Sequence, residues 1–245
     1  MKRAKAIVLA AGKGKRMETD IPKVLNLVAG KPIIEWIVEA LEATNVNEIF
    51  IVVSDENRID IERFLGNRCN YVLQKKQMGT AHAVLQVENF LKDFNGNTFV
   101  MVGDAPGIKS KDLMTLQHTH EKNKNICTFL TAHLTDKKPP WGRIIRDCFG
   151  KVMKIVEERE ATEEELKVNE ISSSHFIFDN KSLFVNLHDI KNNNVLREYY
   201  LSDIVELLSQ KGKVETVIID DILKIYGTNT KEELERINKY FSEVK

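Results

Sequence analysis

The sequence lacks several features that would place it in a class of protein at once. Its three cysteines, Cys69, Cys127 and Cys148, are far apart and form no C-x-x-C pair, which argues against a disulfide framework or a zinc site. No apolar run approaches the roughly 20 residues that a membrane-spanning helix needs. The 36 basic and 36 acidic residues cancel, so no overall charge attracts nucleic acid or an anionic membrane. We therefore expect a cytoplasmic monomer or small homo-oligomer that binds neither nucleic acid nor membranes.

The chain also lacks a linker rich in glycine, proline or serine, an internal repeat and a low-complexity tract. Its 245 residues, 42% of them hydrophobic, can bury a full core. Short apolar runs alternate with amphipathic segments, a pattern typical of parallel strands joined by helices. Strands are expected at 6–10, 49–53, 70–73, 98–102, 126–132, 142–146, 152–156, 175–178 and 214–219, and helices at 33–41, 59–65, 80–91, 200–209 and 232–241. The pattern predicts a single α/β domain with a mainly parallel mixed sheet flanked by helices.

A glycine-containing loop follows the first expected strand. Gly12 and Gly14 let backbone N–H groups face a close ligand, and Arg16 and Lys23 add positive charge, a combination that suits a triphosphate. The dinucleotide pattern G-x-G-x-x-G would need glycine where Met17 stands, and the P-loop pattern is absent. Taken alone, the loop is as consistent with a solvated surface turn as with an anion site.

Two other regions of the sequence, one at Asp104 and one at Gln74 and Gln77, are equally ambiguous when each is considered alone. Asp104 follows the strand at 98–102, at the edge where open α/β sheets bind their ligands, and a carboxylate there is a natural magnesium ligand. A residue that caps a turn would look the same. Gln74 and Gln77 carry amides that could read a base edge, or they are polar residues between a strand and a helix.

A longer motif removes much of this ambiguity. Residues 9–34, LAAGKGKRMETDIPKVLNLVAGKPII, resemble the opening signature of the sugar-1-phosphate nucleotidyltransferases. They are closest to the N-terminal uridylyltransferase domain of the bacterial bifunctional N-acetylglucosamine-1-phosphate uridylyltransferases. Seven further blocks follow in the order of that family: 74–83 (QKKQMGTAHA), 103–106 (GDAP), 141–144 (WGRI), 155–158 (IVEE), 192–194 (NNN), 198–203 (EYYLSD) and 227–229 (GTN). Such an ordered series is specific to one family.

The resemblance implies a Rossmann-like nucleotide-diphospho-sugar transferase fold. In that fold residues 1–110 would hold the nucleotide and residues 111–245 the sugar, without a hexapeptide-repeat acetyltransferase domain. The implied reaction transfers the uridylyl group of UTP to a sugar 1-phosphate, first of all N-acetylglucosamine 1-phosphate, with Mg²⁺ as cofactor. The products would be a UDP-sugar and pyrophosphate. Another hexose 1-phosphate or nucleoside triphosphate is the alternative within this chemistry, and a non-catalytic UDP-sugar sensor is the alternative outside it.

The same resemblance implies a role for individual residues. Arg16, Lys23 and Asp104 would be catalytic, and Asp104 and Asn229 would hold the metal. The expected nucleotide-binding residues are Leu9, Ala10, Ala11, Gly12, Gly14, Lys23, Gln74, Gln77, Gly79 and Thr80. The expected sugar-binding residues are Val102, Gly103, Gly142, Glu157 and Ser172. Ser172 replaces an asparagine of the family pattern and Val102 a tyrosine, so the sugar is the substrate that the sequence determines least.

Overall fold

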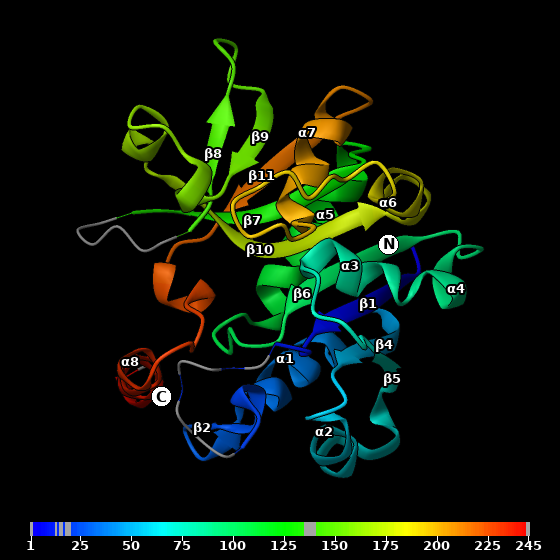
Figure 1. Cartoon of the computed structure of the whole chain (residues 1–245), viewed down its shortest axis with the longest axis vertical. Coiled ribbons are helices and arrows are strands. Elements are labelled where there is room, and N and C mark those ends of the chain that lie inside the picture. The colour runs from blue at the N-terminus through cyan, green and yellow to red at the C-terminus, as the bar shows by residue number, and fades with distance from the viewer. Residues whose placement is uncertain (1, 13, 15–16, 18–20, 135–140, 244–245) are drawn as a thin grey trace.

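The computed structural model describes residues 2–12, 14, 17, 21–134 and 141–243. Within them nine strands form one sheet, whose main path runs β11-β7-β10-β6-β1-β4-β5 while β8 pairs with β10 and β9 (Figure 1). The strands of this sheet are β1 (Ala4–Leu9), β4 (Val46–Val53), β5 (Asn70–Leu73), β6 (Asn97–Val102), β7 (Cys127–His133), β8 (Arg143–Arg146), β9 (Val152–Val156), β10 (Glu170–Asp179) and β11 (Val214–Ile218). β10 is antiparallel to β6 and β7, whereas β1 is parallel to β4 and β6. The predicted α/β domain with a mainly parallel mixed sheet is confirmed.

Helices cover both faces of this sheet (Figure 1). The α-helices are α1 (Ile33–Glu42), α2 (Arg58–Leu65), α3 (Thr80–Leu85), α4 (Glu88–Leu91), α5 (Ser110–Lys122), α6 (Asn180–Leu187), α7 (Ile204–Ser209) and α8 (Lys231–Glu243). α1, α2 and α5 contribute to one buried apolar cluster, and α3, α4, α6 and α7 contribute to another. α8 packs against the small hairpin of β2 (Leu27–Val28) and β3 (Lys31–Pro32) and against α1 in a third cluster. Among the described residues, no helix has the length and apolarity to cross a membrane.

β1 lies at the point where the strand order reverses. Its residues are continuously apolar, apart from Lys5, because helices cover both of its faces. Leu9, at its carboxyl end, is level with Val52 of β4 on one side and Val102 of β6 on the other. The chain goes from β1 to β4 and β5 in one direction and returns to β6 in the other. Ligands of open α/β sheets bind in the crevice at such a reversal, so the loops after β1 and β6 are the place to look for a site.

One predicted helix, at 80–91, is interrupted in the structure. The backbone N–H of Gln86 bonds the carbonyl of Ala83, and that of Val87 bonds the carbonyl of Val84. These bonds reach three residues back instead of four, and such a tight turn ends α3 before α4 begins. The apolar periodicity continues across the break, which is why the sequence predicts one helix.

Other differences arise where polar residues are buried. β10 extends over ten residues instead of the four predicted at 175–178, because Ser172 and Ser173 are buried in the sheet despite their hydroxyl groups. α5 was not predicted, and its buried face includes Gln117 and His120, which weaken the apolar pattern. The sequence signal for burial fails where polar side chains find partners inside the protein.

Candidate functional site

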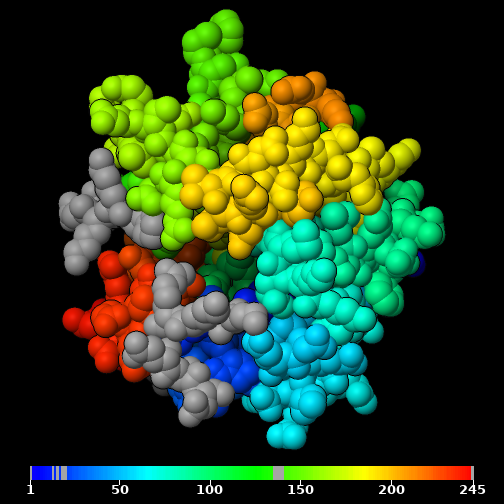
Figure 2. Space-filling view, viewed as in Figure 1, coloured from blue at the N-terminus to red at the C-terminus, as the bar shows by residue number. Residues whose placement is uncertain are grey.

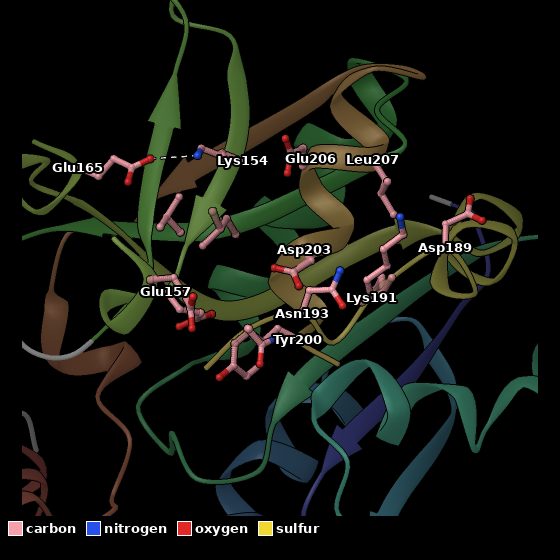
Figure 3. Close-up of a pocket in the computed structure, with 15 residues that line it drawn as sticks. Lys154, Glu157, Glu165, Asp189, Lys191, Asn193, Tyr200, Asp203, Glu206 and Leu207 are labelled. Carbon is pink, nitrogen blue, oxygen red and sulfur yellow. Dashed lines mark ion pairs between the residues drawn. The ribbon is translucent and has the colours of Figure 1, made fainter. Parts of the chain in front are cut away.

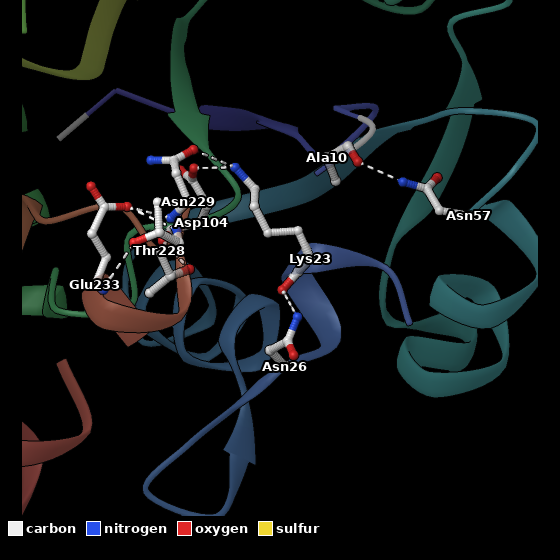
Figure 4. A network of polar contacts seen from close by, with 9 residues as sticks. Ala10, Lys23, Asn26, Asn57, Asp104, Thr228, Asn229 and Glu233 are labelled. Carbon is white, nitrogen blue, oxygen red and sulfur yellow. Dashed lines mark hydrogen bonds and ion pairs between the residues drawn. The ribbon is translucent and has the colours of Figure 1, made fainter. Parts of the chain in front are cut away.

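The turn after β1 is fixed by hydrogen bonds to the neighbouring strand and loop. Ala10 donates its N–H to the carbonyl of Val52, at 2.9 Å, and accepts a hydrogen bond from the Asn57 amide, at 2.8 Å (Figure 4). Gly14 has a φ of 57°, and a Cβ built on it would lie 2.9 Å from the Cβ of Lys23. Glycine therefore allows the loop to pass close to Lys23. The neighbouring Arg16, expected from the resemblance to be catalytic, lies outside the described residues.

A cleft of about 380 Å³ opens at this turn. In the space-filling view a hollow near the centre of this face lies between the segments coloured yellow and cyan (Figure 2). The cleft is lined by Leu9, Ala10, Ala11, Gly12, Lys23, Val24, Gln74, Gln77, Gly79, Thr80, Ala83, Val102, Asp104 and Glu198. All the residues expected to bind the nucleotide are among them except Gly14. The structure thus brings together residues 9–12, 23–24, 74–83 and 102–104 and Glu198, which are separated in the sequence.

Lys23 lies between two oxygen-bearing side chains in this cleft. Its Nζ donates hydrogen bonds to Asp104 Oδ2 at 2.5 Å and to Asn229 Oδ1 at 3.0 Å (Figure 4). Burial alone would raise the pKa of Asp104, but the adjacent ammonium of Lys23 holds the pKa below its ordinary value. Asp104 is therefore ionised near neutral pH, and its charge is balanced by a lysine that could turn to an anionic ligand.

The two oxygens bonded by Lys23 fit a hard cation. Carboxylate and amide oxygens are ligands that Mg²⁺ accepts, and the ammonium occupies the position between them that a cation would take. Gly227 leaves this space open, because a Cβ there would lie 3.1 Å from Asn229 Nδ2 and 3.4 Å from Asp104 Oδ2. In the part of the chain that the structure describes, no group of three or more His, Cys, Asp or Glu side chains could hold a metal. A cation here would need further oxygens from a substrate or from water.

The segment from Gln74 to Thr80 forms the opposite wall. Gln74 is buried, and its Nε2 lies 3.1 Å from the carbonyl of Gly79 and 2.9 Å from His82 Nδ1. Gly79 has a φ of 107°, and a Cβ on it would overlap the backbone of Tyr199. Thr80 accepts a hydrogen bond from the N–H of Leu201 at 2.8 Å. The wall is therefore a rigid support, held from the second half of the chain.

The residues expected to hold the sugar divide into two groups. Val102 lines the cleft described above, and Gly103 donates its N–H to the carbonyl of Leu9. Gly142 and Ser172 are neighbours across β8 and β10, because the N–H of Ser172 donates to the carbonyl of Gly142 at 2.9 Å. A Cβ on Gly142 would lie 3.6 Å from both carboxylate oxygens of Glu157. Gly142, Glu157 and Ser172 thus form one cluster, while Val102 and Gly103 belong to the β1–β6 edge.

Glu157 is a partly buried carboxylate that forms no ion pair with the residues that the structure describes. Ser202 donates a hydrogen bond to its Oε1 at 2.7 Å. Burial raises the pKa of Glu157, although the hydrogen bond from Ser202 opposes the rise. The carboxylate also borders a second cleft of about 490 Å³ between β9 and α7, together with Tyr200, Asp203 and other residues (Figure 3). A carboxylate in this setting is suited to accept hydrogen bonds from neutral hydroxyl groups.

Several residues of the site were not among those given a role from the sequence. Val24, Ala83 and Glu198 line the cleft beside the expected residues. Thr228 is fully buried and donates both its N–H and its hydroxyl to the carbonyl of Asp104. All four lie within motif blocks that resemble the family, at 9–34, 74–83, 198–203 and 227–229, and could have been found there.

Known proteins are similar to this chain over most of its length. The family model described as nucleotidyl transferase matches residues 5–223. The bifunctional protein GlmU of Enterococcus faecalis is 43% identical over 235 residues, which cover 96% of this chain and 51% of that protein. GlmU of Acholeplasma laidlawii is 38% identical over 238 residues, or 97% of this chain and 51% of that protein. The chain therefore spans about half the length of these curated relatives.

A solved structure is similar over nearly the whole chain. It comes from Bacillus anthracis, is assigned as a glucose-1-phosphate thymidylyltransferase and contains sucrose. It superposes with a TM-score of 0.79, is 21% identical, and the match covers 97% of this chain and 94% of that one. At this level of identity the likeness supports the fold.

Proposed function

Because the chain belongs to the nucleotidyl transferase family, as the match over residues 5–223 and the GlmU relatives show, we propose that it transfers the uridylyl group of UTP to a sugar 1-phosphate. The first acceptor to consider is N-acetylglucosamine 1-phosphate, since two relatives named GlmU are 43% and 38% identical to this chain over 96% and 97% of its length, and the motifs resemble the uridylyltransferase domain that uses this acceptor. The products are the UDP-sugar and pyrophosphate.

The observation that carries this proposal is the position of the Lys23 ammonium. It lies between Asp104 and Asn229 in a cleft whose other walls are a glycine-containing turn and the Gln74–Thr80 segment. An exchangeable cation, an ionised carboxylate and open backbone suit a triphosphate that arrives with a divalent metal. In this proposal Gln74 and the Gly79 backbone contact the pyrimidine, and Glu157 and Gly142 contact the sugar hydroxyls.

In the proposed mechanism, an oxygen of the acceptor's phosphate attacks the α-phosphorus of UTP in line with the leaving group. The new P–O bond forms as the bond to the β-phosphate oxygen breaks, and the electron pair leaves with pyrophosphate. The attacking oxygen is already anionic near neutral pH, so no protein base is needed. The chain's contribution is to position both substrates and to neutralise charge.

Individual residues perform these tasks. Lys23 releases Asp104 and bonds the phosphates, and Arg16 assists it. Backbone N–H groups at Ala11 and Gly12 orient the triphosphate. A divalent metal, Mg²⁺ in this proposal, would be held by Asp104 and Asn229 and would neutralise charge on the phosphate oxygens as a Lewis acid.

The test is a matrix of pyrophosphate-release assays, with four nucleoside triphosphates against several sugar 1-phosphates. We expect the largest kcat/KM for UTP with N-acetylglucosamine 1-phosphate, and no release by Asp104→Ala. A larger kcat/KM for another hexose 1-phosphate would correct the acceptor and keep the chemistry. Ser172 and Val102 are the residues that would then explain the difference.

Failure to release pyrophosphate with every pair would contradict the proposed reaction. If isothermal titration calorimetry then showed tight binding of UDP-sugar, the chain would be a sensor instead. Retention of both metal-facing oxygens argues for the enzyme, because binding a product alone does not require them.

A further inference from the structure

The segment that carries Asn229 is fixed on one side to Asp104. It joins the short 3₁₀ turn at Ile222–Ile225 to α8. Thr228, immediately before Asn229, donates its N–H to the carbonyl of Asp104 at 3.0 Å and its hydroxyl at 3.1 Å. The two residues expected to hold the metal are therefore tied together through the backbone, independently of Lys23.

The other side of the segment is held by a carboxylate from α8. Glu233 Oε2 accepts hydrogen bonds from the N–H of Asn229 at 2.6 Å and of Thr230 at 3.1 Å (Figure 4). The hydroxyl of Thr230 accepts a bond from the N–H of Glu233 at 3.2 Å. The pair Thr230 and Glu233 is a capping box, in which the carboxylate ordinarily satisfies the N–H of the capping residue. Here the same oxygen also holds the N–H of the residue before it, which is Asn229.

α8 itself is firmly placed, so Glu233 is a fixed support. Asn238 donates to the carbonyl of Leu27 at 3.2 Å and accepts from the N–H of Ala29 at 2.9 Å. Phe241 packs on Trp36 with ring centroids 4.8 Å apart. These contacts anchor α8 to the N-terminal segment that carries Lys23 and the turn after β1. The Glu233 carboxylate therefore holds the backbone of Asn229 at a fixed place relative to that segment.

We propose that Glu233 is a positioning residue that holds Asn229 in the orientation needed for metal binding. This role rests on the proposed function. Its carboxylate contacts neither the metal nor a substrate. It fixes the backbone N–H of Asn229 and so the direction in which Oδ1 points toward Asp104. Residues that orient metal ligands from behind contribute strongly to metal affinity.

The experiment measures Mn²⁺ binding by electron paramagnetic resonance, on the whole chain with a UTP analogue whose α- and β-phosphorus atoms are joined by a methylene group. Glu233→Ala is expected to raise the Kd for Mn²⁺ about tenfold. Thr230→Ala is the matched control, because it removes the hydroxyl of the same capping box but leaves the bond from Asn229 to Glu233. Both variants should lower Tm, but only Glu233→Ala should weaken Mn²⁺ binding.

Equal Mn²⁺ affinity in Glu233→Ala and Thr230→Ala would overturn the inference, since the glutamate would then be a helix cap only. If Glu233→Ala does not fold, Glu233→Gln replaces it. An amide oxygen is a weaker acceptor than a carboxylate, so a Kd above that of Thr230→Ala supports the inference and an equal Kd overturns it.

The parent proposal is tested by Asp104→Ala in the same measurement. If that variant binds Mn²⁺ as the unmodified chain does, the metal site is elsewhere, and the role of Glu233 is refuted together with it. If Asp104→Ala loses Mn²⁺ and Glu233→Ala does not, only the role of Glu233 is refuted.

Discussion

The pKa values of two carboxylates, Asp104 and Glu157, are shifted in opposite directions. On the nucleotide side Lys23 outweighs the effect of burial and holds the pKa of Asp104 below its ordinary value. On the acceptor side burial raises the pKa of Glu157, whose described partner is the neutral hydroxyl of Ser202. The proposed nucleotide side thus holds a cation that suits anionic phosphates, whereas the proposed acceptor side presents a carboxylate that would repel them and suits hydroxyl groups. In the proposed function this difference would give the site a direction, with phosphates at β1 and β6 and sugar at β8 to β10.

The strongest test of this comparison removes the charges on the nucleotide side. Asp104→Ala should nearly abolish turnover, and Lys23→Ala should lower kcat on the order of a hundredfold or more, as loss of one charge-stabilising group does elsewhere. Steady-state pyrophosphate release measures both. The control is Lys92→Ala, which replaces an exposed lysine immediately after α4. Unchanged turnover in Lys23→Ala would remove the proposed direction of the site.

The next test is structural and concerns the Gln74–Thr80 wall. Gly79→Ala places a Cβ 2.4 Å from the carbonyl oxygen of Tyr199 and strains a φ of 107°. We expect a loss of about 2–5 kcal/mol in the free energy of unfolding, from overlap and strain together, and a higher KM for UTP.

Gly30→Ala is the matched control for Gly79→Ala. Gly30 also has a positive φ, 80°, but its Cβ would meet no atom within 4 Å. Strain alone should then reduce the free energy of unfolding by about 1 kcal/mol. Equal losses in urea titrations of the two variants would show that the wall is not held by Tyr199.

The acceptor side should also be less stable at high pH, because the Asp203 carboxylate is partly buried there and lies near other carboxylates. Burial, then Glu157 and Glu206, raise the pKa of Asp203 to about 6. A folded pKa above the unfolded one means that the native state favours the protonated form, so stability falls as pH rises through about 6. Asp203→Asn should therefore increase the free energy of unfolding at pH 8 by about 1–3 kcal/mol.

Below about pH 4 the carboxyl group is protonated in both states, so Asp203→Asn should then match the unmodified chain. Urea unfolding at both pH values makes the comparison, with the exposed Glu163→Gln as control. A gain that is equal at both pH values would show that the charge of Asp203 is not its cause.

The smallest expected effect belongs to the hydrogen bond that Ser202 donates to Glu157. Ser202→Ala removes the donor at 2.7 Å, which should raise KM for the sugar 1-phosphate about fivefold, equivalent to about 1 kcal/mol, with KM for UTP unchanged. Ser209→Ala is the control, because its hydroxyl bonds the carbonyls of Met153 and Glu206 and not Glu157. An effect on UTP in place of the sugar would reverse the assignment of the two sides.

Much of the nucleotide side could be predicted, because its signals are local. The glycines directly follow the apolar run of β1, and Asp104 closely follows the apolar run of β6, so each signal lies within one short stretch of sequence. The sugar side was harder to predict, since Ser172 and Ser173 are buried in β10 and conceal the strand. The residues expected to bind the sugar also lie in two places. Val102 and Gly103 lie at the β1–β6 edge, apart from the cluster of Gly142, Glu157 and Ser172.

The amino-acid sequence was enough to predict the family, the fold class and most of the strands, since each depends on neighbouring residues or on an ordered series of motifs. Which charged and polar side chains lie against one another could be learned from the fold alone. Lys23 reaches Asn229 across 206 positions and Ser202 reaches Glu157 across 45. Such pairs depend on how the sheet and α8 pack, and a carboxylate's pKa follows from that packing because burial and a neighbouring charge act only through space.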